Sequence, residues 1–236
     1  ILAERRARWQ AANPKKQYVE PKRPNVDGLP EGWVWANLEQ LTWDSSYGTS
    51  QKCDYSASGP PVLRIPNIVK GYIDLSDLKY AIDSKDLSYD NFKWLAPGDI
   101  VVIRTNGSRN LIGRSALVRK SFHSPHYFAS YLIRFRVVQI STLAEWINSI
   151  WNSDVIRRQI ETTSATSAGQ YNVSLSSLNQ FVIPIPSQRE QKRIIAELDR
   201  RLSIIQSTEQ TLDANLARAE RLRQAVLARA FRGELV

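Results

Sequence analysis

The chain has 236 residues, of which 42% are hydrophobic and 23% are charged. This length fits one or two domains, and the composition excludes a wholly disordered or collagen-like chain. The single cysteine, Cys53, cannot form an internal disulfide, and no apolar run approaches the roughly 20 residues that a bilayer requires. We therefore expect a soluble, cytoplasmic protein with no membrane contact. The chain lacks Met and begins at Ile1, which indicates a fragment or a missing native start.

The basic excess is unevenly distributed along the chain. Lys and Arg number 32 against 23 Asp and Glu, a formal net charge of +9. From Ile100 to Ala144 there is no acidic residue, and the seven basic residues are Arg104, Arg109, Arg114, Arg119, Lys120, Arg134 and Arg136. Such segregation favours a polyanionic partner, above all nucleic-acid phosphates. The alternative is a solvated surface without a partner.

The first residues predict a helix followed by a linker. The segment ILAERRARWQAA consists of strong helix formers, and Asn13-Pro14 ends it because proline disfavours the helical conformation of its predecessor. We assign residues 1–13 to the end of a helix that began upstream. Residues 14–28 are basic, contain prolines and lack periodicity, so we expect a linker there.

The middle of the chain, residues 29–186, reads as a mixed α/β domain. The expected strands are Val34–Leu38, Val62–Ile68, Asp99–Thr105, Arg114–Val118, Ser130–Val137 and Phe181–Ile185. Helices are expected from Thr142 to about Trp151 and from Asp154 to about Glu161, and a polar loop over residues 162–172.

Two local patterns in this domain give sharper expectations. Asn106-Gly107 predicts a tight, hairpin-like turn, because this pair favours positive φ. Strand alternation places Tyr131, Ile133, Phe135 and Val137 toward the core, and Arg134 and Arg136 on the outer face.

The last fifty residues predict one long helix. Ser187-Gln-Arg-Glu190 is a capping box, no proline or glycine follows until Gly233, and about 45 residues would extend about 68 Å. The heptad positions are Ile195, Leu198, Leu202, Ile205, Glu209, Leu212, Leu216, Ala219, Arg223, Val226 and Ala230. Nine of these eleven are apolar, which favours a coiled coil over a helix lying along its own domain. A second chain, or the missing upstream helix, would supply the partner.

Motifs for catalysis are absent from the sequence. Neither a glycine-rich phosphate loop nor an Asn/Asp-Pro-Pro-aromatic methyltransferase motif occurs. His123, His126 and Cys53 lack the spacing of a metal site. We expect no metal, no cofactor, no catalytic residue and no enzymatic activity.

Four sequence blocks follow one another along the chain: LPEGWVWANLEQL (29–41), PVLRIPNIVKGYIDLSDLKY (61–80), LAPGDIVVIRTNGSRNLIGRSALV (95–118) and VSLSSLNQFVIPIPSQREQKRII (173–195). In this order they resemble the specificity (S) subunits of Type I restriction-modification systems. Complete subunits of this family carry two target recognition domains, separated by long conserved helices. This chain resembles one half, with only the second recognition domain.

The resemblance implies an α+β fold in which a mixed α/β recognition domain (29–186) precedes a long coiled-coil helix (187–233). The implied function is non-catalytic recognition of one half of a bipartite DNA target. The implied partners are double-stranded DNA, the modification (methyltransferase) subunits and, through the complex, the restriction subunit. Because the first domain is missing, a homodimer through the long helix is a further expectation.

The candidate site residues follow from polar segments and from the heptads. For DNA they are Ser45, Tyr47, Thr49, Ser50, Lys52, Arg104, Asn106, Ser108, Arg109, Asn110, Arg114, Gln170, Tyr171 and Asn172. Asn is suited to adenine and Arg to guanine in the major groove. For a partner helix they are Ile195, Leu198, Leu202, Ile205, Leu212, Leu216 and Val226. Two rival functions stay open: a coiled-coil interaction protein without a DNA role, and a DNA methyltransferase fragment.

Overall fold

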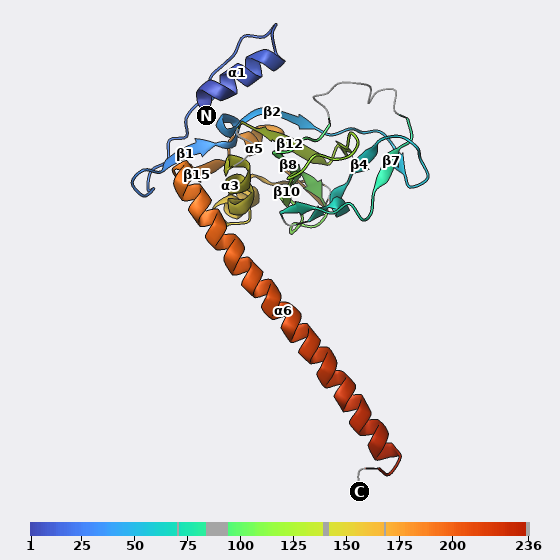
Figure 1. Cartoon of the computed structure of the whole chain (residues 1–236). Helices are drawn as coiled ribbons and strands as arrows, with labels where there is room; N and C mark the ends of the chain where they lie inside the picture. The colour runs from blue at the N-terminus through green and yellow to red at the C-terminus, as the bar shows by residue number, and fades with distance from the viewer. Residues whose placement is uncertain (70, 84–93, 139–141, 168, 235–236) are drawn as a thin grey trace. The chain divides into compact units, whose positions relative to one another are not determined.

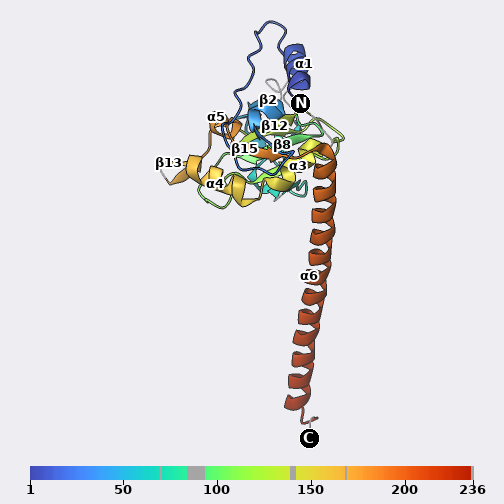
Figure 2. The same ribbon diagram turned by 90° about the vertical axis from the view of Figure 1, so that its left-hand side faces the viewer.

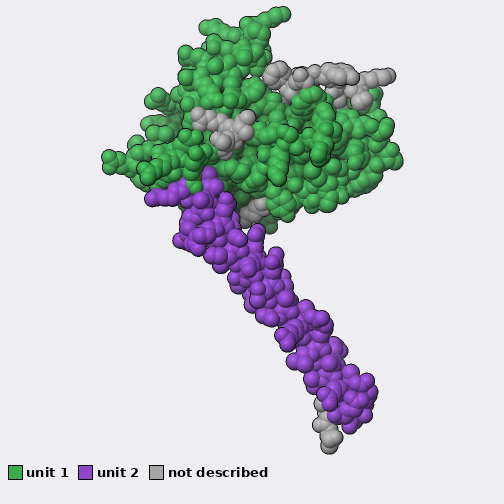
Figure 3. Space-filling model, viewed as in Figure 1, with its two compact units in different colours: residues 1–192 green, residues 193–236 purple. Residues whose placement is uncertain are grey.

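A computed structural model of the chain describes residues 1–69, 71–83, 94–138, 142–167 and 169–234. It separates into two compact units, Ile1–Lys192 and Arg193–Val236, which Figure 3 shows in different colours. The first unit mixes helices and short strands, and the second is part of one long helix, so the expected α+β class is confirmed. None of the described helices is long and apolar enough to cross a membrane.

The core of the first unit is a four-stranded antiparallel sheet in the order β10-β8-β12-β2 (Figure 1). Its strands are β10 (Ser115–Leu117), β8 (Asp99–Ile103), β12 (Leu132–Val137) and β2 (Thr42–Tyr47). Every residue of β8 is buried, because DIVVI is almost entirely β-branched and lies between two neighbours. The strands expected over 99–105, 114–118 and 130–137 are therefore confirmed, with ends shifted by one or two residues.

A second sheet, in the order β11-β4-β7-β3, adjoins the first. Its strands are β11 (Tyr127–Phe128), β4 (Pro61–Leu63), β7 (Lys79–Ala81) and β3 (Cys53–Asp54). The single strand expected over 62–68 is wrong: β4 gives way to a 3₁₀ turn at Ile65–Asn67, and β5 (Ile68–Val69) pairs with β6 (Tyr72–Ile73) instead. Pro66 has no N–H for a ladder, and the Asn67 side chain accepts from the N–H of Arg64 (2.8 Å), which closes the turn.

The entry and exit of the mixed domain lie side by side. β1 (Val34–Asn37) pairs antiparallel with β15 (Val182–Ile185), and both lie within the strands expected over 34–38 and 181–185. The short helix α2 (Leu38–Leu41) follows β1 and starts with a capping box between Asn37 and Gln40. The other elements of the mixed domain are α3 (Thr142–Ile150), α4 (Asp154–Thr163), α5 (Leu175–Asn179), β9 (Thr105–Asn106), β13 (Ala165–Ser167) and β14 (Gln170–Asn172). Figure 2 shows α4, α5 and β13 gathered at one side of the first unit.

The N-terminal helix α1 (Leu2–Ala12) is fastened to this domain by one arginine. Arg5 is 5% exposed, and its Nε donates to the carbonyls of Glu39 (2.7 Å) and Thr42 (2.9 Å). These carbonyls lie at the end of α2, where they lack helical partners. A second nitrogen of Arg5 donates to the hydroxyl of Tyr18 (2.8 Å), whose ring packs edge-on against Trp9. The α1 helix is thus part of the first unit.

The long helix α6 runs over Gln188–Phe231, 44 residues or about 66 Å, as expected from the sequence. Ser187 accepts from the N–H of Glu190 at its start (3.3 Å), and Gly233 ends it with a φ of 73°. Two arginines, Arg200 and Arg201, hydrogen-bond to Glu197 and lower the pKa of its carboxyl to about 2. Six of the seven candidate partner-helix residues are exposed, and Ile195 is half-buried.

Candidate nucleic-acid interface

Two of the seven cations in the acid-free segment are neutralised inside the protein. The Arg134 side chain is 1% exposed and pairs with Asp44 of β2. Arg136 donates to both carboxylate oxygens of Asp99 on β8 (2.9 and 3.1 Å), and the Asp99 side chain is fully buried. The two arginines do lie on one face of β12, since both reach the carbonyl of Trp94, but the expectation that this face is the outer one is wrong. Both side chains are largely buried, and the neighbouring strands β2 and β8 each supply an aspartate. Tyr131, expected in the core, is 37% exposed.

Burial of these two ion pairs shifts the pKa values of Asp99 and Arg134. Burial raises the pKa of Asp99, and the hydrogen bond and charge of Arg136 oppose this rise. Burial likewise lowers the pKa of Arg134. Both arginines also donate to the carbonyl of Trp94, at 3.2 and 2.8 Å. Charges that are matched in this way hold the sheet together and are not available to phosphates.

A third cation of the segment, Arg119, is also engaged. It makes two hydrogen bonds to the carboxylate of Glu145 on α3 (both 3.1 Å) and one to the carbonyl of Gly71 (3.0 Å). The four others are exposed or half-buried: Arg104, Arg109, Arg114 and Lys120. The first three of these are candidate DNA-binding residues.

The described residues of the polar stretch 162–172 lie mostly in helix and strand, contrary to the expected loop. It contains β13 and β14, and β14 pairs with β9 so that Tyr171 lies opposite Asn106 and Asn172 opposite Thr105. Gln170 and Asn172 are exposed and Tyr171 is half-buried. The sequence did not predict these strands, because their residues are polar and show no apolar alternation. Backbone pairing with β9, more than 60 residues earlier in the chain, orders them instead.

A tyrosine–arginine contact lies at the end of β2. The candidates Ser45 to Lys52 were expected to share one polar loop, but the chain is strand as far as Tyr47. The Arg104 guanidinium lies 4.8 Å from the centre of the Tyr47 ring, and the Tyr47 hydroxyl accepts from the N–H of Leu175 (3.1 Å). Arg104 also donates to the carbonyl of Ser130 (3.3 Å), whose N–H donates to the carbonyl of Thr49 (2.8 Å). These contacts bring Tyr47, Thr49 and Arg104 together.

The other candidates from this stretch lie elsewhere. Ser45 is half-buried within the β2–β12 ladder. Ser50 and Lys52 are exposed and line a shallow cavity with Ile82 and Asp83. The structure thus does not gather residues 45–52 into one site.

Asn106 and Gly107 do not form the expected tight turn. The Asn106 side chain accepts from the N–H of Ser108 (2.7 Å), and Gly107 is not among the glycines with positive φ. The chain continues through residues 108–113 before β10 begins. Gly113, with a φ of 75°, supplies the left-handed conformation, and Ile160 of α4 occupies the space that a side chain there would need.

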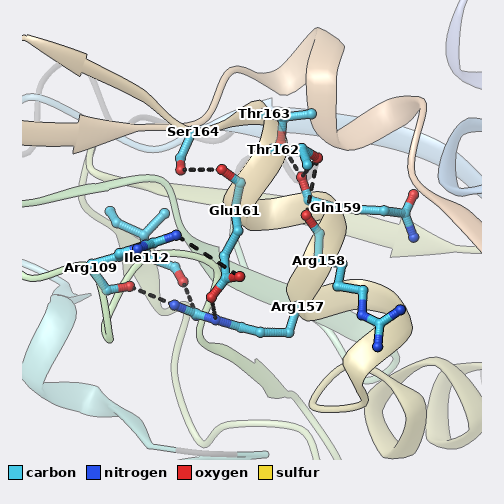
Figure 4. A network of polar contacts seen from close by, with 9 residues as sticks. All are labelled: Arg109, Ile112, Arg157, Arg158, Gln159, Glu161, Thr162, Thr163 and Ser164. Carbon is cyan, nitrogen blue, oxygen red and sulfur yellow. Dashed lines mark hydrogen bonds and ion pairs between the residues drawn. The ribbon is translucent and has the colours of Figure 1, made fainter.

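The loop 107–113 carries Ser108, Arg109 and Asn110 and rests on α4 (Figure 4). Arg157 of α4 donates to the carbonyls of Arg109 (3.0 Å) and Ile112 (3.2 Å). The Arg109 guanidinium lies 3.9 Å from the carboxylate of Glu161. Asn110 and Arg114 line a cavity with Trp151, Arg157 and Ile160.

We define the β9–β14 surface by the candidates that these contacts bring together: Tyr47, Thr49, Arg104, Asn106, Gln170, Tyr171 and Asn172. The loop 107–113 continues directly from it. The surface offers amide groups that both donate and accept, two tyrosine rings and a guanidinium, and the loop adds Arg109. Such groups can contact base edges and phosphates together.

Arg157 and Glu161 were missed by the sequence-based predictions. Their spacing of four residues on a helix was visible, but such pairs are common on solvated helix faces and worth little by themselves. Only the packing of α4 against the loop gives them significance.

Metal-ligating side chains do not cluster in the part of the chain that the structure describes, where no group of three or more His, Cys, Asp or Glu could hold an ion. His126 is buried, stacks on Phe122 at 4.2 Å and has its Nδ1 2.8 Å from the carbonyl of Ser124. Burial lowers the pKa of His126.

Comparison with known proteins gives consistent matches. No family model matches the chain. It is 29% identical over 199 residues to the specificity subunit of the Type I restriction enzyme EcoKI of Escherichia coli K12, covering 84% of this chain and 42% of that subunit. It is also 29% identical over 205 residues to the StySPI specificity subunit of Salmonella potsdam, covering 86% and 43%. The chain thus spans less than half the length of these curated relatives.

Solved structures share the fold. A chain from work on the assembly and conformational transition of the type I R-M system matches with a TM-score of 0.66, at 20% identity, over 99% of this chain and 53% of that one. The HsdS subunit from Thermoanaerobacter tengcongensis matches with a TM-score of 0.57, at 21% identity, over 99% and 52%. The expected resemblance to half of a Type I specificity subunit is confirmed.

Proposed function

We propose that this relative of Type I specificity subunits reads one half of a bipartite DNA target and performs no reaction itself. The observation that carries the proposal is the β9–β14 surface. There the Arg104 guanidinium lies over the Tyr47 ring, and three exposed or half-buried amide side chains, Asn106, Gln170 and Asn172, lie on two strands fixed by backbone pairing. Amide groups held on a rigid strand suit base edges, and cations beside them suit the flanking phosphates.

The proposed division of the chain follows the sequence boundaries. Residues 1–13 end a preceding conserved helix, 14–28 form a linker, 29–186 form the recognition domain, and 187–233 form the spacer helix. The antiparallel β1–β15 pair supports a self-contained domain, because it joins the two ends of 29–186.

The spacer helix is proposed to pair with another helix. Leu202, Leu212 and Leu216 are 54%, 62% and 62% exposed, and such an apolar stripe needs cover. For the chain alone, the helix of a second copy would cover the stripe. In a longer parent protein, the upstream conserved helix would cover it. The modification subunits would dock on this part, and the restriction subunit would join through them, in the cytoplasm.

The test is selection from a pool of random-sequence DNA duplexes, using the whole 236-residue chain. We expect one short motif to be enriched. We expect Gln170→Ala, on the β9–β14 surface, to change that motif at one or two positions, because an exposed amide contributes a donor and an acceptor. Gln206→Ala, an exposed glutamine of α6, is the matched control and should leave the motif unchanged.

The outcome also separates the rival functions. Absence of any enriched motif, with a flat response of binding to salt, would favour the coiled-coil interaction protein. Binding of a methyl-donor cofactor by the purified chain would favour a methyltransferase fragment.

A further inference from the structure

Glu161 lies between two guanidinium groups (Figure 4). Its Oε1 accepts from Nε of Arg157, one helical turn earlier on α4, at 3.1 Å. Its Oε2 lies 3.9 Å from Nη2 of Arg109 on the loop 107–113. The first contact is a hydrogen bond, whereas the second is an ion pair beyond hydrogen-bond distance and therefore exchangeable.

The position of Glu161 does not depend on the Arg109 side chain. Arg157 is held by three acceptors, namely Glu161 and the carbonyls of Arg109 and Ile112. If the Arg109 side chain leaves to contact DNA, Glu161 keeps its bond to Arg157 and is not left unpaired. Release of Arg109 therefore costs little.

The loop itself is fixed relative to α4. Trp151 donates from its indole N–H to the carbonyl of Gly113 (2.7 Å), and Ile160 fills the space beside the Gly113 Cα. The Arg109 backbone thus stays near Glu161, while its side chain, 56% exposed, can turn toward a ligand.

A fixed negative charge next to Arg109 acts differently on the two kinds of DNA contact. It offsets the attraction of Arg109 for any phosphate, since this attraction is mainly electrostatic and independent of sequence. It weakens a bidentate contact to a guanine edge less, because that contact depends on short, directed hydrogen bonds.

We infer that Glu161 is a positioning residue for specificity, which turns Arg109 from phosphate contacts toward base reading. This inference rests on the proposed function. It assigns to α4, which carries none of the candidate reading residues, a part in sequence discrimination.

The experiment measures the affinity of the whole chain for two probes: the duplex enriched from the random pool and a shuffled duplex of equal composition. We expect Glu161→Gln to tighten binding to the shuffled duplex roughly three- to tenfold, and binding to the enriched duplex by less. The slope of log affinity against log salt for the shuffled duplex should steepen by up to about 0.9, for one added phosphate contact.

A second background tests whether the effect passes through Arg109. In Arg109→Ala, the further change Glu161→Gln should alter the ratio of the two affinities less than twofold. Glu145→Gln removes the carboxylate of another arginine-paired glutamate, on α3, and serves as the matched charge control.

Three results would overturn the inference. They are an equal gain of Glu161→Gln on both duplexes, the same change of ratio in Glu145→Gln, and an unchanged effect in the Arg109→Ala background. Failure of the wild-type chain to distinguish the two duplexes would instead refute the proposed function, and the inference with it.

Discussion

We expect removal of one partner of the buried pair of Asp99 and Arg136 to lower the unfolding free energy by more than the loss per partner when both are removed together. The two residues lie opposite each other on β8 and β12, and their side chains are 0% and 11% exposed. Asp99→Asn removes the carboxylate and leaves the buried guanidinium of Arg136 hydrogen-bonded to neutral groups such as the carbonyl of Trp94. Arg136→Met leaves the Asp99 carboxylate buried beside a backbone N–H and the more distant Arg134.

The expected magnitudes follow from this burial. An uncompensated buried charge costs about 3–5 kcal/mol of unfolding free energy, so each single variant should lose that much. In the double variant Asp99→Asn/Arg136→Met no charge is left, the Met side chain fills the place of the arginine stem, and Asn can still accept from the N–H of Ala96. We expect the double variant to be at least about 2 kcal/mol more stable than the sum of the single losses predicts.

Tryptophan fluorescence during urea unfolding is the suitable assay. All seven tryptophans precede residue 193, so their fluorescence reports on the first unit and not on residues 193–236 of α6. The urea midpoints and slopes give the unfolding free energies. Additive losses would show that the two charges do not stabilise each other, and the reasoning about the sheet would fail. A folded Arg136→Met variant should bind DNA with an unchanged slope of log affinity against log salt. A shallower slope would show that Arg136 does contact phosphates.

Two further predictions concern pH and association. Burial lowers the pKa of His126, so the folded state resists protonation of its ring. The stability that is present above about pH 6.5 should therefore be lost as the pH falls through the lowered pKa. The variant His126→Gln should remove this loss of stability, whereas a change of the exposed His123 to Gln should not. Equal pH profiles for wild type and His126→Gln would refute this. Leu212→Asp should weaken self-association of the chain by about tenfold or more in sedimentation experiments, because burying a leucine at a heptad position contributes about 1.5–3 kcal/mol. Ala214→Asp lies two residues further along the same helix, outside the seam of heptad positions, and should not weaken it. Equal effects of the two aspartates would exclude the seam.

The elements that the sequence predicted are those whose signal is local. β8 is an apolar run, β12 alternates apolar residues with arginines, and α6 has a capping residue, an unbroken run of helix formers and a terminal glycine. Their positions therefore followed from the residues alone, with the strand ends shifted by one or two residues. The candidates Asn106, Gln170 and Asn172 were chosen only as polar loop residues, and their pairing in a ladder was not foreseen.

The errors concern contacts between distant parts of the chain. Arg134 and Arg136 looked like surface cations because their aspartates, Asp44 and Asp99, are 90 and 37 residues away in the sequence. Likewise, nothing near Arg109 in the sequence shows that Arg157 and Glu161 lie beneath it. Long-range pairing of charged residues leaves no periodic pattern, so only the folded structure shows which cations stay available.

The hydrogen bonds of Arg5 to the end of α2 determine where a domain of this kind can be exchanged between relatives. Proline-bearing residues 14–28 look like the natural place to join a foreign domain. A graft at that point would separate Arg5 from the carbonyls of Glu39 and Thr42 and free α1 to swivel. Chimeras joined before Ile1 would keep the contacts of Arg5, so α1 and the domain would move as one rigid unit. The direction in which α1 enters the domain would then be preserved.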